Sequence, residues 1–160
     1  MGGLKSLVSR NFLALVESGN IRYVAQPVGA PIAMVSDGAA LAWAWAAYVQ
    51  IIVAATITDP SWLVGIAIHT CAVETHNGDI AIARGAADAE VDLAIIPYAA
   101  AFAGATANLA AMPIVDKTIW LPYPVKIAGA PRLAGRIRKN TGVSAAGVSL
   151  KVILATAVGA

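Results

Sequence analysis

The segment from Ala39 to Thr58 contains no charged residue, and it constrains the fold more than any other part of the chain. As a helix it would be long enough to cross the ~30 Å of hydrocarbon in a bilayer. Its second half, however, is rich in β-branched and aromatic residues, which lose rotamer freedom on a helix and pack well on a pleated sheet. Asp59-Pro60 then ends the segment as a turn. We therefore expect a strand near 41–58.

The composition favours a large buried core, since 59 % of the 160 residues are apolar and only 12 % are charged. Cys71 is the only cysteine, so no disulfide can form within the chain and stability must come from packing or association. The first residues lack a long apolar stretch followed by a small-residue cleavage site, which predicts synthesis in the cytosol without a cleaved signal.

Turn residues divide most of the chain into apolar segments with the length of strands. This pattern predicts an all-β fold: a single-domain antiparallel β-sandwich, jelly-roll-like, with an N-terminal helix or extended arm. The arm covers residues 1–30 and the sandwich covers residues 31–160. The predicted strands lie near 41–58, 62–73, 79–84, 90–96, 107–115, 123–128, 132–139 and 147–156.

Three segments are less regular. Residues 4–18 have the spacing of an amphipathic helix, with an extended arm as the alternative, and 21–25 is a short strand. Residues 96–111 form a loop or a broken strand, because proline, glycine and threonine interrupt an alanine-rich stretch.

Alternation of apolar and polar residues predicts which side chains face the core. Segments 47–58 and 62–73 are apolar on both faces and are expected to be buried on both. In the alternating strands, the side chains predicted to point inward are Val91, Leu93 and Ile95; Leu133, Gly135 and Ile137; and Val148, Leu150, Val152 and Leu154.

Charge is divided between two segments, although the formal net charge is only +2. Every charged residue after Asp116 is basic, whereas residues 74–92 contain five acids and one arginine. The two segments are expected either to attract each other, within a subunit or between neighbours, or to form separate solvated faces.

His69 and Cys71, with Glu74 and His76 close behind, are residue types that bind zinc. The paired Cys or His spacings typical of structural zinc sites are missing, however. We therefore expect a buried histidine, a buried thiol and a histidine in a turn, with no metal and no other cofactor.

Two pairs of carboxylates, Glu90 with Asp92 and Asp79 with Asp88, are candidates for acid–base catalysis. Alternation places the first pair on an outward face, where carboxylates are ordinarily solvated. The chain also lacks a nucleophile elbow, a phosphate-binding loop, a dinucleotide fingerprint and an H-E-x-x-H pair. We therefore predict that the protein is not an enzyme and has no small-molecule substrate.

Arg132, Arg136 and Arg138 are predicted to point outward together, beside Lys139. Such a row could hold phosphates, but that strand lacks the aromatic residues on which single-stranded nucleic acids stack. We expect these arginines to contact an acidic surface of another protein rather than nucleic acid.

Trp43 and Trp45 flank a single alanine, so their rings share one face of an extended segment. Two such rings either form a stacking platform for sugars or fill a core or a subunit interface.

The segment Leu121–Lys139 (LPYPVKIAGAPRLAGRIRK), followed by Val148–Leu154 (VSLKVIL), resembles a pattern in small virion structural proteins of tailed bacteriophages. In that pattern a proline-punctuated strand leads through a turn into an arginine-bearing strand, and the resemblance covers about Trp43 to Leu154. It implies a β-sandwich or jelly-roll subunit of the capsid decoration (cement) type, often trimeric, with no catalysis. One departure is Ala130-Pro131, where the pattern more often has a glycine-containing hairpin.

Residues and resemblance together predict a decoration protein that stabilises a virion shell. It would form a homo-oligomer, with a trimer favoured, and contact the major capsid protein or another virion protein. We expect it in the virion, after synthesis in the host cytoplasm. Two alternatives are an integral membrane protein with helices near 39–58 and 94–115, and a carbohydrate-binding jelly-roll module of a tail or fibre built around Trp43 and Trp45.

Overall fold

The computed structural model describes residues 12–14, 16–35, 43–57, 60–72, 76–100, 117–129, 131–140 and 147–157. Residues 12–14 and 16–17 are helical, and the rest of the regular structure is extended. The described strands are β1 (Ile21–Gln26), β2 (Ile32–Val35), β3 (Val49–Ile52), β4 (Ser61–Ala72), β5 (His76–Arg84), β6 (Val91–Ala100), β7 (Lys117–Ile127), β8 (Leu133–Lys139) and β9 (Gly147–Ala157).

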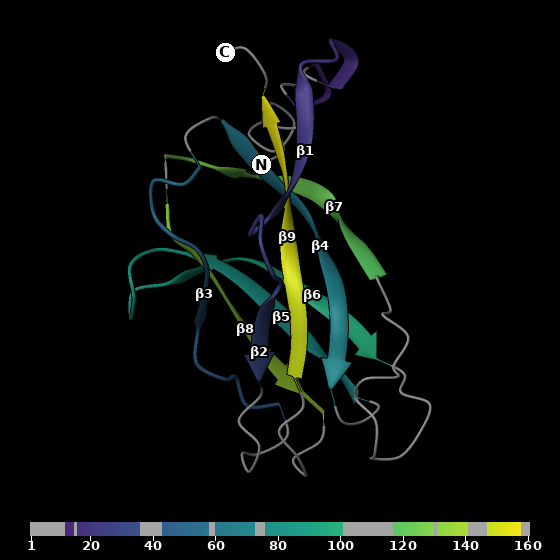
Figure 1. Cartoon of the computed structure of the whole chain (residues 1–160), viewed down its shortest axis with the longest axis vertical. Helices are drawn as coiled ribbons and strands as arrows, with labels where there is room; N and C mark the ends of the chain where they lie inside the picture. The colour runs from purple at the N-terminus through teal and green to yellow at the C-terminus, as the bar shows by residue number, and fades with distance from the viewer. Residues whose placement is uncertain are drawn as a thin grey trace, which may run out of the picture.

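The strands form two antiparallel sheets, which Figure 1 shows one in front of the other. Sheet A has the order β1-β9-β4-β7, with β2 also paired to β9, and sheet B has the order β3-β8-β5-β6. Because β1 and β2 pair with successive stretches of β9, they act as one interrupted strand. The hairpin partners are then nested, with β1 and β2 against β9, β3 against β8, β4 against β7 and β5 against β6. This is the pairing of an eight-stranded jelly roll, and it confirms the predicted β-sandwich.

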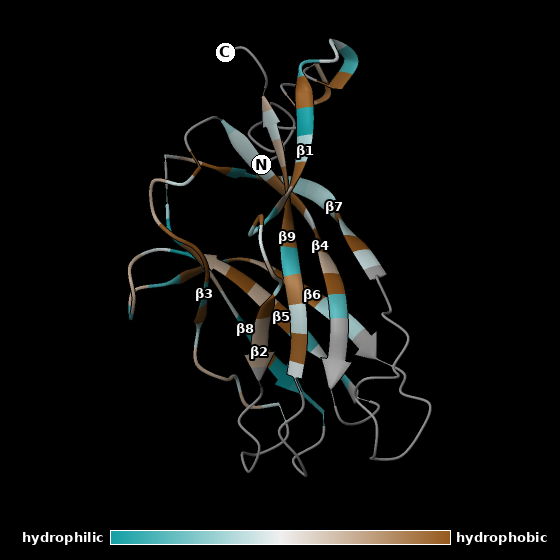
Figure 2. Ribbon diagram, viewed as in Figure 1, coloured by the Kyte–Doolittle hydropathy of each residue, from teal (hydrophilic) through white to brown (hydrophobic). Residues whose placement is uncertain are grey.

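The core lies between the two sheets and is formed by the alternate residues of each strand that point inward. In β9, Val148, Leu150, Val152 and Leu154 are at most 2 % exposed, as predicted, and the polar Ser149 and Lys151 alternate with the first three (Figure 2). Burying each such side chain contributes about 1.5–3 kcal/mol. Between β4 and β9, the buried hydroxyls of Ser61 and Thr156 lie 3.2 Å apart and satisfy each other.

Strand β4 is buried on both faces, as the sequence predicts for 62–73. On its outer face, Trp62 and Val64 join a second apolar cluster with Ile153 of β9. The ring of Phe12 meets Trp62 edge to face, with ring centroids 5.7 Å apart. The outer face of β4 is therefore partly covered by the N-terminal segment of the same chain.

The predicted strand at 41–58 is wrong for most of its described length. Only Val49–Ile52 is a strand, residues 53–56 are exposed, and Ala55 has a φ of 66°. Residues 43–48 run beside β8 without joining it as a regular ladder, and their aromatic side chains lie against its arginines. The helix expected there in the membrane alternative is likewise not seen at 43–57, and 91–100 is β6.

The predicted burial pattern in 90–96 is wrong at two of its three inward positions, since only Leu93 packs against the core. Val91 is 63 % and Ile95 is 52 % exposed, whereas Ile96 and Tyr98 are buried. The pairing of β5 with β6 shifts between Ile82 and Ala83, so a β-bulge at Leu93 reverses the faces and turns Ile95 outward. Val91 is exposed at the start of the strand. A prediction that assumes strict alternation across a bulge assigns the wrong side chains to the core.

The remaining predictions differ in outcome. β1 confirms the strand expected at 21–25, whereas β2 falls in a stretch where no strand was predicted. β7 is longer than the predicted 123–128. The strand predicted at 107–115 and most of the helix at 4–18 lie outside the described residues. Within the described part of the chain, no helix has the length and apolar character needed to cross a membrane.

Candidate functional site

The three arginines singled out in the sequence each meet a carboxylate on the outer side of sheet B. Arg132 lies 2.7 Å from Glu90, Arg136 lies 2.8 Å from Asp92, and Arg138 lies 2.7 Å from Asp79. These pairs join the basic C-terminal segment to the acidic segment at 74–92, so the predicted attraction occurs within one chain. Whether the arginines also contact a partner stays a prediction.

Aromatic rings cover the guanidinium groups of two of these arginines. Arg136 lies over Trp45 at 4.7 Å and over Tyr48 at 4.3 Å, measured to the ring centroids. Arg138 lies over Trp45 at 4.6 Å and over Trp43 at 5.5 Å. Trp43 and Trp45 do share a face, as predicted, but that face is stacked on cations rather than open as a platform.

Backbone hydrogen bonds hold this aromatic segment in place. The amide of Trp43 donates to the carbonyl of Lys139 at 2.7 Å, and that of Ala46 donates to the carbonyl of Ile137 at 2.9 Å. Residues 43–48 therefore form a strap along β8. We call the strap, the arginines of β8 and their carboxylate partners the arginine ladder.

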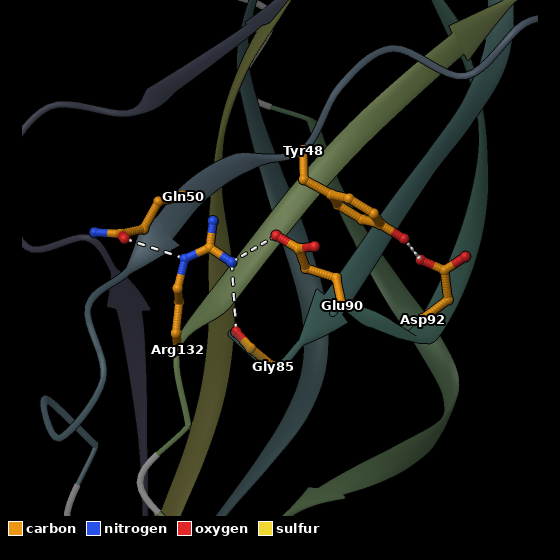
Figure 3. A network of polar contacts seen from close by, with 6 residues as sticks. All are labelled: Tyr48, Gln50, Gly85, Glu90, Asp92 and Arg132. Carbon is orange, nitrogen blue, oxygen red and sulfur yellow. Dashed lines mark hydrogen bonds and ion pairs between the residues drawn. The ribbon is translucent and has the colours of Figure 1, made fainter. Parts of the chain in front are cut away.

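Tyr48 closes the arginine ladder at Asp92. Its hydroxyl donates a hydrogen bond of 2.6 Å to one carboxylate oxygen of Asp92, while the other oxygen accepts from Arg136 (Figure 3 shows the tyrosine contact). Burial and this bond to a carboxylate raise the pKa of Tyr48 to about 12. The hydroxyl is thus held as a proton donor in a structural bond.

Arg132 makes a separate network at the end of sheet B (Figure 3). Its guanidinium donates to Gln50 at 3.1 Å, to the carbonyl of Gly85 at 3.4 Å and to Glu90 at 2.7 Å. The bond from Arg132 holds the pKa of Glu90 below its ordinary value. A carboxyl with a lowered pKa is a poor proton donor near neutral pH.

The expectation that Glu90 and Asp92 are solvated is wrong. Their side chains are 5 % and 27 % exposed, and both are in ion pairs. Alternation alone missed these pairs because it places a side chain on a face without showing what covers that face. Asp88, by contrast, is exposed in the turn before β6.

The other candidate ligands are only partly described. His69 and Cys71 lie on β4 and His76 begins β5, while Glu74 is outside the described residues. Among the residues that the structure does describe, no group of three His, Cys, Asp or Glu side chains is placed to hold a metal ion.

The outer side of sheet A carries a groove that the sequence did not predict. The groove has a volume of about 490 Å³ and is lined by Phe12, Tyr23, Val64, Trp120, Leu121 and Pro124. We call it the aromatic groove. Tyr23 and Trp120 are 52 % and 58 % exposed, and their rings meet edge to face at 6.1 Å.

A wide bulge in β7 forms one wall of the aromatic groove. The pairing with β4 jumps from Leu63 opposite Val125 to Gly65 opposite Trp120, so the LPYP segment at 121–124 lies opposite Val64 alone. Because β7 is the edge strand of sheet A, its two prolines remove no hydrogen bond from an inner ladder. Tyr123, in this bulge, is 75 % exposed.

Gly65 allows Trp120 to lie against the sheet. A Cβ atom at position 65 would be 2.6 Å from the carbonyl oxygen of Ile119 and 3.3 Å from the Trp120 ring. The pair of prolines in LPYP was the available sequence signal for this site, since proline inside a strand marks an edge or a bulge.

The charges of sheet A are all of one sign. Its five described strands contain four basic residues and no Asp or Glu: Arg22, Lys117, Lys126 and Lys151. None of the three whose side chains are described, Arg22, Lys126 and Lys151, is in an ion pair with another described residue. Within the described residues, the three arginines on the outer side of sheet B are paired with carboxylates, whereas these three cations of sheet A are not.

Comparison of the chain with profiles of protein families, with curated proteins and with solved structures finds no match. A jelly roll by itself hosts many unrelated functions. Function therefore has to be inferred from the surfaces of this chain.

Proposed function

We propose that the protein is a structural subunit of a virus particle, of the type that decorates and stabilises a capsid. It acts by association, without catalysis, as a homo-oligomer in which a trimer is favoured. Its second partner is the major capsid protein or another virion protein. The jelly roll, found among viral capsid domains, and the resemblance of about Trp43 to Leu154 to phage virion proteins support this proposal.

Strand β6 is the observation on which the proposal depends most. In the described part of the chain it is an edge strand, paired only with β5, and it is 10 residues long. It exposes Val91 and Ile95, which are 63 % and 52 % accessible. Soluble proteins usually protect such an edge with charges or a covering segment, because it can pair with another chain. We propose that β6 is covered by a neighbouring subunit.

The arginine ladder supports a structural role for the opposite edge of the same sheet. The stacked rings tie the strap at 43–48 to Arg136 and Arg138 of β8. The ion pairs of these two arginines join β8 to Asp92 of β6 and to Asp79 of β5. Ion pairs that form a network contribute more than isolated surface pairs, which are worth ~0–1 kcal/mol each. Such a cross-linked face resists local opening.

Light scattering during size-exclusion chromatography tests the proposal. We expect the purified protein to be a trimer, and Ile95→Lys to shift it to a monomer because a lysine would be buried in the contact. Val53→Lys is the matched control, since Val53 is 60 % exposed in a turn outside the strands. A wild-type monomer that does not sediment with virus shells would refute the proposal.

A further inference from the structure

We propose that the aromatic groove on sheet A binds an acidic polysaccharide. This inference goes beyond the proposed function, since it assigns a ligand to a face that assembly through β6 leaves open. It depends on three features of the described residues: exposed ring faces, a hollow floor and uncompensated positive charge.

The ring faces come from two strands that lie on either side of β9 and β4. Tyr23 on β1 and Trp120 on β7 contact each other above these strands and line the groove. Pyranose rings present patches of C–H groups that pack against aromatic faces. Tyr and Trp suit such contacts because each combines a large apolar ring with a polar tip.

A small residue lies beside each of these rings on the neighbouring strand. Following the strand pairing, Tyr23 is level with Ala155, and Trp120 is level with Gly65. Val64 closes the floor between them. This hollow of about 490 Å³ is open to solvent, has mainly apolar walls and is large enough for a sugar ring.

The positive charges on the outer face of sheet A favour an acidic ligand. Position along β4 shows where the lysines lie. Trp120 is paired with Gly65 of β4, Lys126 with Trp62 before it, and Lys151 with Ala67 after it. One lysine therefore lies on each side of Trp120 along the strand direction. No carboxylate occurs in the strands of sheet A to compensate them. Carboxylates of a uronic acid polymer would form charge-assisted hydrogen bonds with these lysines.

The arrangement favours a polysaccharide over single-stranded nucleic acid. Nucleic acid binders track a phosphate on every nucleotide with a continuous basic groove, whereas the described cations here are few and separated. Tyr23 and Trp120 also meet edge to face, at an angle of 76° between ring planes, so they offer no parallel pair of faces to stacked bases.

Titration of tryptophan fluorescence with three acidic oligosaccharides tests this inference: hexagalacturonate, hexamannuronate and a hyaluronan octasaccharide. We expect at least one to bind, and its methyl ester to bind at least ~5-fold more weakly, since the ester keeps the rings but removes the charge. We expect Trp120→Ala to weaken binding ~10-fold or more, as for a central aromatic contact. Lys126→Gln with Lys151→Gln should remove most of the salt dependence.

The matched control is Trp43→Ala, because Trp43 is 49 % exposed but lies on the arginine ladder of sheet B. It should leave binding unchanged, and thermal unfolding should show that each variant is folded. Binding that Trp120→Ala leaves intact, no binding to any of the three acids, or tighter binding to oligo(dT) would each overturn the inference. A trimer that binds no glycan refutes this inference alone, whereas glycan binding by a monomer refutes only the proposed assembly.

Discussion

The two outer faces of the sandwich use the same kinds of residue to opposite effect. On sheet B, Trp45 and Tyr48 stack on arginines whose charges are neutralised by carboxylates within the chain. On sheet A, Trp120 is exposed beside lysines for which the strands supply no acid. Residue type alone therefore does not distinguish a face that is closed by internal pairing from one that is left open.

The largest difference is expected when a cation is removed from each face. Arg136→Ala should lower the free energy of unfolding by about 2–4 kcal/mol, because it removes the cationic partner of Asp92 and the group stacked on Trp45. Lys126→Ala on sheet A should change it by less than ~0.5 kcal/mol. Urea unfolding measures both. Equal effects would mean that the arginine ladder contributes no more than an ordinary surface.

Removing one tryptophan from each face is expected to have a smaller effect. Trp45→Ala should cost about 2 kcal/mol, since its ring is half-buried and stacks on two guanidinium groups. Trp120→Ala should cost less than ~1 kcal/mol, because the ring is 58 % exposed. Thermal unfolding compares the two, and a larger loss at Trp120 would show that the aromatic groove is part of the core.

At high pH, Tyr48 is expected to make the stability of the folded chain depend on pH. Below pH 10 the tyrosine keeps its proton in both folded and unfolded chains, so its contribution is constant. Between pH 10 and about 12 the unfolded chain loses this proton while the folded chain retains it, and stability falls as pH rises. Tyr48→Phe should lose less stability than the wild type over this range in urea unfolding at pH 8 to 12. Parallel curves would contradict the raised pKa.

Low pH is expected to give the smallest effect, at Glu90. Its pKa is lowered in the folded chain, so its stabilisation is complete above its ordinary pKa of 4.5 and is lost as pH falls through the folded value. Glu90→Gln should therefore be less stable than the wild type at pH 6, with the gap closing below pH 4.5. Asp88→Asn, at an exposed carboxylate, is the control.

The fold class was predicted from the alternation of apolar and polar residues. The prediction was most accurate where strict alternation extends through a strand. β9 and β8 have the inward residues expected, including Gly135, whose missing side chain leaves room for Met34 and Ile51. Prediction from alternation failed at β6, where a bulge reverses the faces. It also failed at 43–48, where extended backbone lies over a sheet instead of within it. Both depend on neighbours that are distant in the sequence.

The candidate site was predicted less well than the fold. Sequence identified the arginines but could not show that three carboxylates neutralise them, because these pairs link residues 42 to 59 positions apart. The aromatic groove combines residues from the N-terminal segment, β1, β4 and β7, so no local motif reveals it. The LPYP bulge was its one local sign.

Arginine labelling with phenylglyoxal, followed by mass spectrometry, tests whether the arginines of sheet B are closed off by their ion pairs, because sheet A contains an exposed arginine for comparison. Arg22 on sheet A is exposed and outside any described ion pair, whereas Arg132, Arg136 and Arg138 are each bonded to a carboxylate. We expect Arg22 to react at least ~10-fold faster than the other three, since charge-assisted bonds block their nitrogens. Equal rates at all four positions would contradict the claim that ion pairs within the chain close off the arginines of sheet B.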